Sequence, residues 1–409
     1  MTIFPSYNND LPILKLKTQA DSINTKKVSL IGMPGDRDLQ IGDTFFLQFR
    51  DVGMERIRSS ITHLKPASSP LLSLINGAKP FPHEYSFDAG IKTPNNTLNP
   101  KQQVAYQAVM TQENPIVLIR GPPGTGKTRI IAEIARRCGA DENFRFIVCS
   151  QANEIIDEIV TKIDFMGDKL LRYQSRSHEA NFPNIPHGVK AAALKITGNH
   201  ARSEDIEREK VRLLNKAQII CTTLGAIDFV KFLGIKRFDI MVVDEAGQAN
   251  ELEVLQALAL FPKKLVLIGD DRQLRPFCDR DSETSSSMFT RLFQAGYPFV
   301  ELDEQYRMCF ENCSLISQIF YDNKLKTSGG KLKARGAPGK RPWDKRLCFV
   351  HSDGEESKET DTNFQETSYK NDDQVEKIFN IVEELLRNGL TDLKQVSILT
   401  PYVAQKRVI

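Results

Sequence analysis

The chain has 409 residues, of which 40% are hydrophobic, and this is enough sequence for two or three domains that each have their own core. Its 55 basic and 52 acidic side chains leave a formal net charge of +3. That balance excludes a protein that attracts polyanions over its whole surface, so any nucleic-acid site must be a local groove.

The N-terminus and the cysteines indicate a reducing compartment. Met1–Pro5 lacks the basic and then apolar segments of a signal peptide, and no run approaches the roughly 18 apolar residues of a membrane span. The seven cysteines are an odd number, which favours free thiols. Cys309 and Cys313 share a helix face without a second pair at zinc spacing, so we expect packing there and no metal. The protein is expected in the cytoplasm or the nucleus.

Residues 1–97 predict a small β module. Short alternating stretches, such as Val28–Ile31 and Asp43–Phe49, are separated by Gly and Pro, and helical periodicity is weak up to about residue 90. From residue 98 to residue 297 the pattern changes to strand, turn and helix, which predicts an α/β domain.

A glycine-rich loop opens this domain. The run Ile116–Ile119 leads directly into the sequence GPPGTGKT, and apolar residues then recur on one helical face. In such a P-loop, backbone N–H groups surround phosphate oxygens, the lysine reaches the β and γ phosphates, and the threonine hydroxyl binds Mg2+. The loop predicts a nucleoside triphosphate site made by Gly121, Pro122, Pro123, Gly124, Thr125, Gly126, Lys127 and Thr128.

Further strands are predicted on either side of a polar segment. Residues 174–210 carry both signs of charge, which is typical of a solvated insertion without chemistry. Near-continuous apolar runs indicate strands that are buried on both faces of a parallel sheet. Besides the run before the P-loop, these are Phe144–Cys149, Ile219–Thr222, Ile240–Val243 and Leu265–Ile268.

Polar residues that follow these strands complete the expected site. Asp244 and Glu245 end an apolar strand, which is the Walker B arrangement, so Asp244 is expected to join Thr128 at Mg2+ and Glu245 to polarise the attacking water. Gln273 follows the next strand and is expected to sense the γ phosphate. Gln102 lies upstream of the P-loop, where its amide can read the adenine edge through paired hydrogen bonds.

A second α/β pattern occupies residues 298–409, with apolar runs at Phe299–Leu302, Leu347–Val350 and Val396–Leu399. It is interrupted by the basic segment Lys331–Arg341 and the acidic segment Asp353–Asp361. Because Gly and Pro punctuate the basic segment, a flexible loop is favoured there over a nucleic-acid patch.

The motifs together resemble those of superfamily 1B helicases of the up-frameshift type, over about residues 98 to 409. They occur in the family's order and are highly specific as a set. They are LNPKQ (98–102), GPPGTGKT (121–128), DEAGQ (244–248), GDDRQLRP (269–276), EQYRM (304–308) and TPYVAQ (400–405).

The resemblance implies two tandem RecA-like lobes, residues 98–297 and 298–409, and an ATPase that moves 5′ to 3′ on single-stranded RNA or DNA. It also implies that the β module of residues 1–97 matches part of the family's accessory β-barrel. By position, Gln102 would select adenine, Tyr306 would stack on the base and Arg307 would reach the γ phosphate. The resemblance also implies protein partners that act in RNA metabolism. The implied nucleic-acid contacts are Ser150 and Asn153, with the residues between them, Thr222, Thr223, Thr400, Pro401 and Tyr402.

The chain also departs from the family pattern. After Cys149 the family usually has a small residue followed by Pro, Ser and Asn, whereas this chain has Gln151 and Ala152 at the positions of the Pro and the Ser. After the QYRM motif, Cys309–Phe310 replaces the usual His-Pro. The chain ends at Ile409, in a helix expected to begin after Pro401, before the family's late glutamine-glycine and arginine motifs. We therefore expect an incomplete second lobe.

Two functions from different classes fit these residues. The first is a nucleic-acid-dependent ATPase and helicase, and the second is a non-catalytic ATP-binding nucleic-acid or adaptor protein, because the loss of an arginine finger removes about 10³ to 10⁵ in rate. A P-loop kinase or transporter ATPase is disfavoured, since Gln273 and Arg307 have no role in those schemes.

Overall fold

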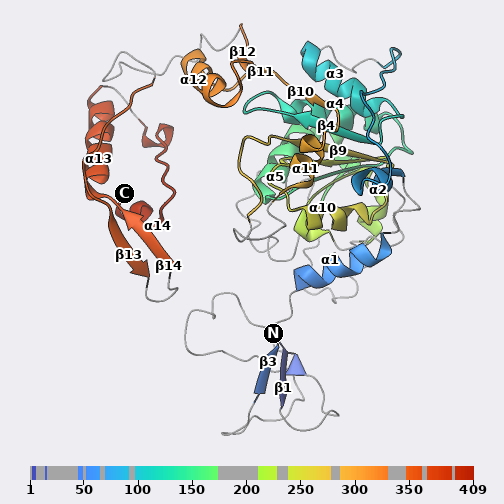
Figure 1. The fold of residues 1–409 in the computed structure, drawn as a ribbon, viewed down its shortest axis with the longest axis horizontal. Coiled ribbons are helices and arrows are strands. Elements are labelled where there is room, and N and C mark those ends of the chain that lie inside the picture. The colour runs from blue at the N-terminus through green and yellow to red at the C-terminus, as the bar shows by residue number, and fades with distance from the viewer. Residues whose placement is uncertain are drawn as a thin grey trace. The chain divides into compact units, whose positions relative to one another are not determined.

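Figure 1 shows the fold of the chain in a computed structural model. The chain divides into two units, one formed by Gly53–Ala334 and the other by Met1–Val52 together with Arg335–Ile409. The structure describes residues 2–5, 14–15, 45–48, 52–64, 70–91, 97–173, 211–227, 238–277, 286–329, 347–361, 366–388 and 392–409.

A parallel sheet organises the Gly53–Ala334 unit. Within the described residues it has seven strands in the order β10-β4-β9-β8-β5-β7-β6. Five of them coincide with the predicted apolar runs and are completely buried, which confirms the α/β fold with a RecA-like lobe. These strands are β4 (Ile116–Arg120), β5 (Phe146–Ser150), β7 (Ile219–Thr223), β8 (Ile240–Val243) and β9 (Lys264–Gly269).

The two outer strands of this sheet are short. Strand β6 (Leu170–Arg172) pairs with β7, and β10 (Phe299–Glu301) pairs with β4. The sequence pattern placed Phe299–Leu302 at the start of the second lobe, whereas the structure adds it to the sheet that carries the P-loop. The reason is backbone pairing, since Phe299 lies opposite Leu118 and the N–H of Leu302 donates to the carbonyl of Arg120.

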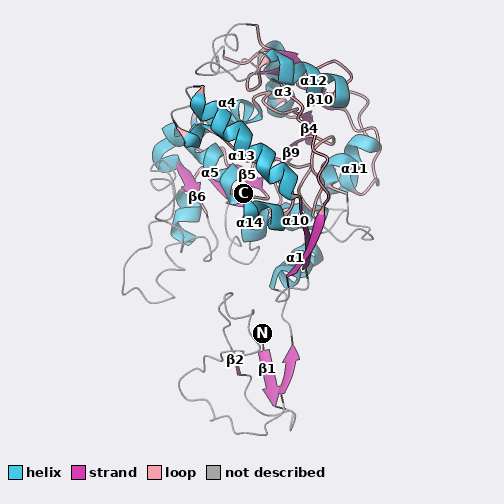
Figure 2. Cartoon of the chain, turned by 90° about the vertical axis from the view of Figure 1, so that its left-hand side faces the viewer, coloured by secondary structure: helices cyan, strands magenta, loops and turns pink. Residues whose placement is uncertain are grey.

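Helices pack against the sheet, and Figure 2 separates them from the strands by colour. Helix α4 lies between α3 and α5, and its Ile130, Ile131 and Ile134 are fully buried in the core, as the periodicity predicted. Within the described residues, the helices of this unit are α1 (Val52–His63, from its second residue), α2 (Pro70–Ile75), α3 (Pro100–Met110), α4 (Lys127–Gly139), α5 (Asn153–Lys162), η3 (Asp164–Lys169), η5 (Leu224–Ala226), α10 (Glu251–Leu258), α11 (Met288–Gln294) and α12 (Phe310–Phe320).

A small second sheet and core follow the large sheet. Strands β11 (Glu304–Gln305) and β12 (Lys326–Thr327) pair in parallel. Beside them Cys313 packs in a cluster with Tyr321 and Leu325, as expected of a core cysteine.

The N-terminal segment is only partly β structure. Strands β1 (Thr2–Pro5), β2 (Leu14–Lys15) and β3 (Phe45–Gln48) form an antiparallel sheet, which confirms a strand within Asp43–Phe49. The stretch Val28–Ile31 lies outside the described residues. Residues 52–63 and 70–75 are helical instead, because α2 buries its four apolar side chains in the core of the parallel-sheet unit.

The C-terminal segment contains an antiparallel pair, β13 (Ser357–Asp361) and β14 (Glu366–Lys370), and the helices α13 (Asp372–Arg387), η8 (Leu393–Gln395) and α14 (Val403–Val408). Helix α14 confirms the helix predicted after Pro401. The runs 347–350 and 396–399 were predicted as strands but are irregular, and Phe349 and Leu399 are about nine-tenths exposed, so these apolar runs have no strand partner among the described residues. In the part of the chain that the structure describes, no helix has the length and apolarity to cross a membrane.

Candidate functional site

The P-loop connects β4 to α4 and requires glycine at two positions. Gly124 and Gly126 have φ angles of 76° and 81°, which other residues rarely adopt. A Cβ atom on Gly124 would lie 2.7 Å from Cβ of Arg307, and one on Gly126 would lie 2.6 Å from Nε2 of Gln102. Gly126 is also the N-cap of α4 and provides no side chain, which leaves the first N–H groups of the helix open to an anion.

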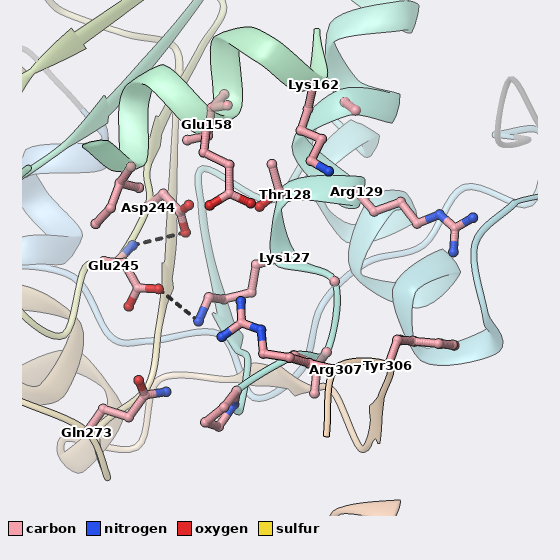
Figure 3. Close-up of a pocket in the computed structure, with 17 residues that line it drawn as sticks. Lys127, Thr128, Arg129, Glu158, Lys162, Asp244, Glu245, Gln273, Tyr306 and Arg307 are labelled. Carbon is pink, nitrogen blue, oxygen red and sulfur yellow. Dashed lines mark hydrogen bonds and ion pairs between the residues drawn. The ribbon is translucent and has the colours of Figure 1, made fainter. Parts of the chain in front are cut away.

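A pocket of about 470 Å³ lies over this loop, within the Gly53–Ala334 unit (Figure 3). Its volume falls within the usual range for small-molecule sites. It brings together the predicted catalytic residues with most of the P-loop. The lining residues are Pro123, Gly124, Thr125, Gly126, Lys127, Thr128, Arg129, Ala132, Ile155, Glu158, Ile159, Lys162, Asp244, Glu245, Gln273, Tyr306 and Arg307.

Lys127 is held at the base of the pocket. Its Nζ lies 3.0 Å from Oε1 of Glu245 and donates a hydrogen bond of 3.1 Å to the carbonyl of Gly121. Glu245 itself has a φ angle of 51°, so the turn after β8 aims its carboxylate at the lysine. The ammonium and the predicted general base are therefore paired.

Asp244 is the deepest carboxylate of the site. Burial raises its pKa to about 6, while Lys127 works in the opposite direction and Glu245 adds to the rise. Its Oδ1 accepts a 3.0 Å hydrogen bond from the N–H of Glu245. Figure 3 shows Asp244 and Thr128 facing the same space. A carboxylate and a hydroxyl fit Mg2+, which takes few protein ligands and completes its shell with phosphate and water.

Gln273 and Arg307 reach the pocket from two loops. Nε2 of Gln273 donates to Oδ2 of Asp270 over 2.6 Å. The backbone N–H of Arg307 donates to Oε1 of Gln305 over 2.8 Å, which fixes the main chain, while its side chain extends into the pocket (Figure 3). Both side chains therefore line the same pocket as Lys127.

Tyr306 is anchored beside the P-loop. Its N–H donates to the carbonyl of Gly124 over 2.8 Å. Its hydroxyl accepts a hydrogen bond from Nδ2 of Asn99 over 2.8 Å and donates to Glu304 over 3.0 Å. The ring is thus held at the pocket edge.

Gln102 is fully buried behind the loop. Its Nε2 donates to the carbonyl of Thr125 over 2.8 Å, and its Oε1 accepts from the N–H of Asn99 over 3.0 Å. It does not line the pocket. In this geometry the amide supports the P-loop backbone, whereas the sequence predicted that it reads adenine.

The lobe-one residues predicted to contact nucleic acid gather at the carboxyl ends of β5 and β7. Ser150 lies opposite Thr223 in the register of the two strands. Ser150 and Thr222 are fully buried, and Thr223 is 9% exposed. Oδ1 of Asn153 accepts a 2.9 Å hydrogen bond from buried Arg172. These residues therefore lie together at the strand ends, and Ser150 and Thr222 are buried there.

Thr400, Pro401 and Tyr402 lie in the other unit, before α14. The ring of Tyr402 is 40% exposed and meets Tyr369 edge to face at 5.6 Å. The hydroxyl of Thr400 accepts a hydrogen bond from the N–H of Tyr402. These residues line a separate pocket of about 160 Å³.

Sequence reasoning missed three charged residues of the large pocket. Arg129 follows the P-loop on α4, and Glu158 and Lys162 stand one turn apart on α5. Figure 3 shows Glu158 directed at Thr128 and Asp244. The i, i+4 spacing of Glu158 and Lys162 was visible, but nothing in it distinguishes a site from a solvated helix face.

Comparison with known families supports the motif assignment. One AAA domain model matches residues 97–188 and 189–280, and a second matches residues 284–409. The solved structure of the PRRSV helicase is 18% identical, with a TM-score of 0.31 over 56% of this chain and 38% of that one.

The curated relatives are helicases. The chain is 29% identical to the ATP-dependent helicase NAM7 of Saccharomyces cerevisiae over 81% of this chain and 35% of the relative. It is 30% identical to the putative ATP-dependent RNA helicase ECM32 of the same yeast, over 83% and 32%. It is 28% identical to the regulator of nonsense transcripts 1 homolog of Arabidopsis thaliana, over 76% and 27%. The chain thus spans about a third of the length of these relatives.

Proposed function

The chain belongs to the up-frameshift type of superfamily 1B helicases, and from this membership we propose that it binds and hydrolyses ATP with Mg2+ on single-stranded nucleic acid. The observation that supports this proposal is the single pocket that joins Lys127, the two carboxylates Asp244 and Glu245, and the γ-phosphate candidates Gln273 and Arg307.

Each side chain has a role in this proposal. The N–H groups of the P-loop and Lys127 bind the β and γ phosphates, and Thr128 and Asp244 hold Mg2+. The metal supplies neutralisation of charge on the phosphate oxygens. Glu245 accepts a proton from the water that attacks the γ phosphorus, the bond to the β-γ bridging oxygen breaks, and ADP and phosphate leave.

In this proposal, Gln273 and Arg307 bind the γ phosphate. The amide of Gln273 is oriented by Asp270, and the guanidinium of Arg307 enters the pocket from the segment after β11. Both offer N–H donors to oxygens whose charge grows in the transition state. Tyr306 provides a ring at the pocket edge on which a base stacks.

RNA is the proposed strand, with 5′-to-3′ movement. The name of the yeast relative ECM32 contains RNA helicase, and the family resemblance supplies the direction. The proposed strand contacts are, in the Gly53–Ala334 unit, the ends of β5 and β7 with Asn153 and, in the other unit by itself, the segment Thr400–Tyr402. Because Ser150 and Thr222 are buried, RNA binding is expected to change the local conformation there.

Hydrolysis by the full chain, with and without single-stranded RNA, tests the proposal. Lys127→Ala should abolish binding of a fluorescent ATP analogue, whereas Glu245→Gln should keep binding and lose turnover. Lys101→Ala is the matched control, since this exposed lysine lies outside the pocket. Binding without hydrolysis by the wild type would instead support a non-catalytic adaptor.

The proposed mode of RNA binding predicts how the affinity depends on salt. Contacts with the backbone of a single strand release counterions, so log K should fall with log salt by about 0.7 for each neutralised phosphate. Mixed-sequence RNA of equal length should bind alike. Salt-independent binding, or selection of one short sequence, would contradict the proposed mode.

A further inference from the structure

Tyr321 lies outside the pocket, at the C-terminal end of α12, yet its hydroxyl contacts the network behind the γ-phosphate side of the site. The side chain is 5% exposed. Its hydroxyl donates to Oδ2 of Asp270 over 2.7 Å. The same oxygen accepts the 2.6 Å hydrogen bond from Nε2 of Gln273. One carboxylate oxygen therefore joins α12 to a side chain of the pocket.

Asp270 depends on these donors. Its carboxylate is 2% exposed, and its other oxygen accepts from the N–H of Arg272 over 3.1 Å. A buried carboxylate is costly unless its oxygens are hydrogen-bonded. Without the Tyr321 hydroxyl, Gln273 is the remaining donor to Oδ2 of Asp270 among the described contacts. The side chains of Asp270 and Gln273 then become free to move.

A second set of contacts fixes Tyr321. The guanidinium of Arg272 lies 5.9 Å from the centre of the Tyr321 ring, donates to the carbonyl of Phe320 and pairs with Asp322 at 2.9 Å. The ring also packs with Cys313 and Leu325 in the small core. The end of α12 is thereby tied to the loop that carries Gln273.

Helix α12 therefore carries a contact with the site at each end. Arg307 enters the pocket just before its first residue, Phe310, and Tyr321 follows its last residue. Helix α12 therefore connects, along the chain, the segment of Arg307 with the hydrogen bond from Tyr321 to Asp270.

We propose that Tyr321 is a positioning residue of the ATP site, which orients Gln273 through Asp270 and connects that glutamine to the helix that follows Arg307 in the chain. The inference rests on the proposed ATPase function. The hydroxyl touches neither nucleotide nor water in this scheme, so its effect is expected on turnover and on recognition of the γ phosphate, with nucleotide binding as such preserved.

Tyr321→Phe tests the proposal, because it keeps the ring and removes the hydroxyl. In the full chain with single-stranded RNA, kcat should fall about tenfold while KM changes less than about threefold, since one charge-assisted hydrogen bond of the positioned network is lost. Gln273→Ala should reduce kcat at least as much, and the double variant should be no slower than Gln273→Ala alone.

Tyr297→Phe is the matched control. This tyrosine is also buried, and its hydroxyl donates to the carbonyl of Ile116, away from Asp270. It should lower thermal stability and leave kcat unchanged. Unaltered kcat in Tyr321→Phe, or losses that add in the double variant, would overturn the positioning role.

A binding measurement separates this inference from the proposed function. The ratio of affinities for a non-hydrolysable ATP analogue and for ADP should fall equally in Tyr321→Phe and Gln273→Ala. A wild type that binds neither nucleotide would overturn the ATPase proposal and this one with it. A wild type that favours the ATP analogue, with an unchanged ratio in Tyr321→Phe, would overturn the role of Tyr321 alone.

Discussion

Lys264 is a lysine inside the parallel sheet of the P-loop unit, where strand β9 begins. Its Nζ donates to the carbonyls of Val109 and Thr111 at the C-terminal end of α3. Burial lowers its pKa from 10.5 to about 8, and Glu113 offsets part of this effect. The helix end is thus capped by an amine that loses its proton at a lower pH than an exposed lysine does.

This residue predicts a pH dependence of stability. Between about pH 8 and 10.5 the unfolded chain keeps a proton on Lys264 that the folded chain has released, so this residue increases the free energy of unfolding as pH rises. Relative to Lys264→Met, the wild type should gain about 1 to 3 kcal/mol across this window. Urea unfolding of both proteins at pH 7.5 and pH 10 measures the difference, and parallel behaviour would contradict the assignment.

Gly124 gives a second prediction at the residue scale. Gly124→Ala should lower kcat about tenfold or more, because its Cβ would displace Arg307 besides straining a φ of 76°. Gly77→Ala is the control, since its φ is 75° and its Cβ would meet nothing within 4 Å. Steady-state ATPase assays and thermal melts of both variants separate the effect of backbone strain, which both share, from the displacement of Arg307, which only Gly124→Ala causes. Equal ATPase rates in the two variants would show that the contact with Arg307 is unimportant.

Single residues also show where sequence reasoning succeeds and where it stops. The P-loop glycines were predictable because their spacing reflects a local backbone requirement. The direction of the Gln102 amide was not, because its partners, Asn99 N–H and the Thr125 carbonyl, are set by the packing of α3 on the loop. Burial of Ser150 likewise depends on neighbours that no local pattern names.

At the scale of elements, Tyr85 joins β10 to β4. Its hydroxyl accepts a hydrogen bond from the N–H of Leu118 and donates to the carbonyl of Pro298, the residue before β10. The short edge strand that leads to Arg307 is thus fastened by a side chain from a distant loop. Burial raises the Tyr85 pKa well above its usual value, so the hydroxyl stays protonated.

Tyr85→Phe should therefore destabilise the unit by about 1 to 3 kcal/mol, because two buried backbone groups lose their partner. Denaturant unfolding measures this loss. Tyr369→Phe is a suitable comparison, since that ring is 37% exposed in the C-terminal unit and should change stability by less than about 0.5 kcal/mol. A Tyr85→Phe protein as stable as the wild type would show that water replaces the hydroxyl.

Elements were predictable where periodicity was long. Five strands buried on both faces stood out as continuous apolar runs, whereas β6 has only three residues and ends in an arginine. The run Val396–Leu399 has the same composition as a strand but no strand partner among the described residues. An apolar run shows that a segment can form a buried strand, but whether a neighbouring strand is present to pair with it is decided by the tertiary fold.

For the whole molecule, the division into units makes a prediction about the ATP site. All residues of the 470 Å³ pocket, including Tyr306 and Arg307, belong to Gly53–Ala334. A protein of residues 53–334 should therefore bind ATP with a Kd within about threefold of the full chain, a difference below about 1 kcal/mol. Titration with a fluorescent analogue measures both. Weakening of about tenfold or more would place a nucleotide contact in the other unit.

The pairing of Lys127 with Glu245 has a thermodynamic consequence for any ATPase assay built on this site. A nucleotide that recruits the ammonium must first separate it from the carboxylate, so the measured affinity is the phosphate interaction reduced by the free energy of that exchange. Glu245→Gln abolishes the competition together with catalysis. This variant should bind ATP more tightly than the wild type before any chemistry occurs, so its Kd would overstate the affinity of the wild type for ATP.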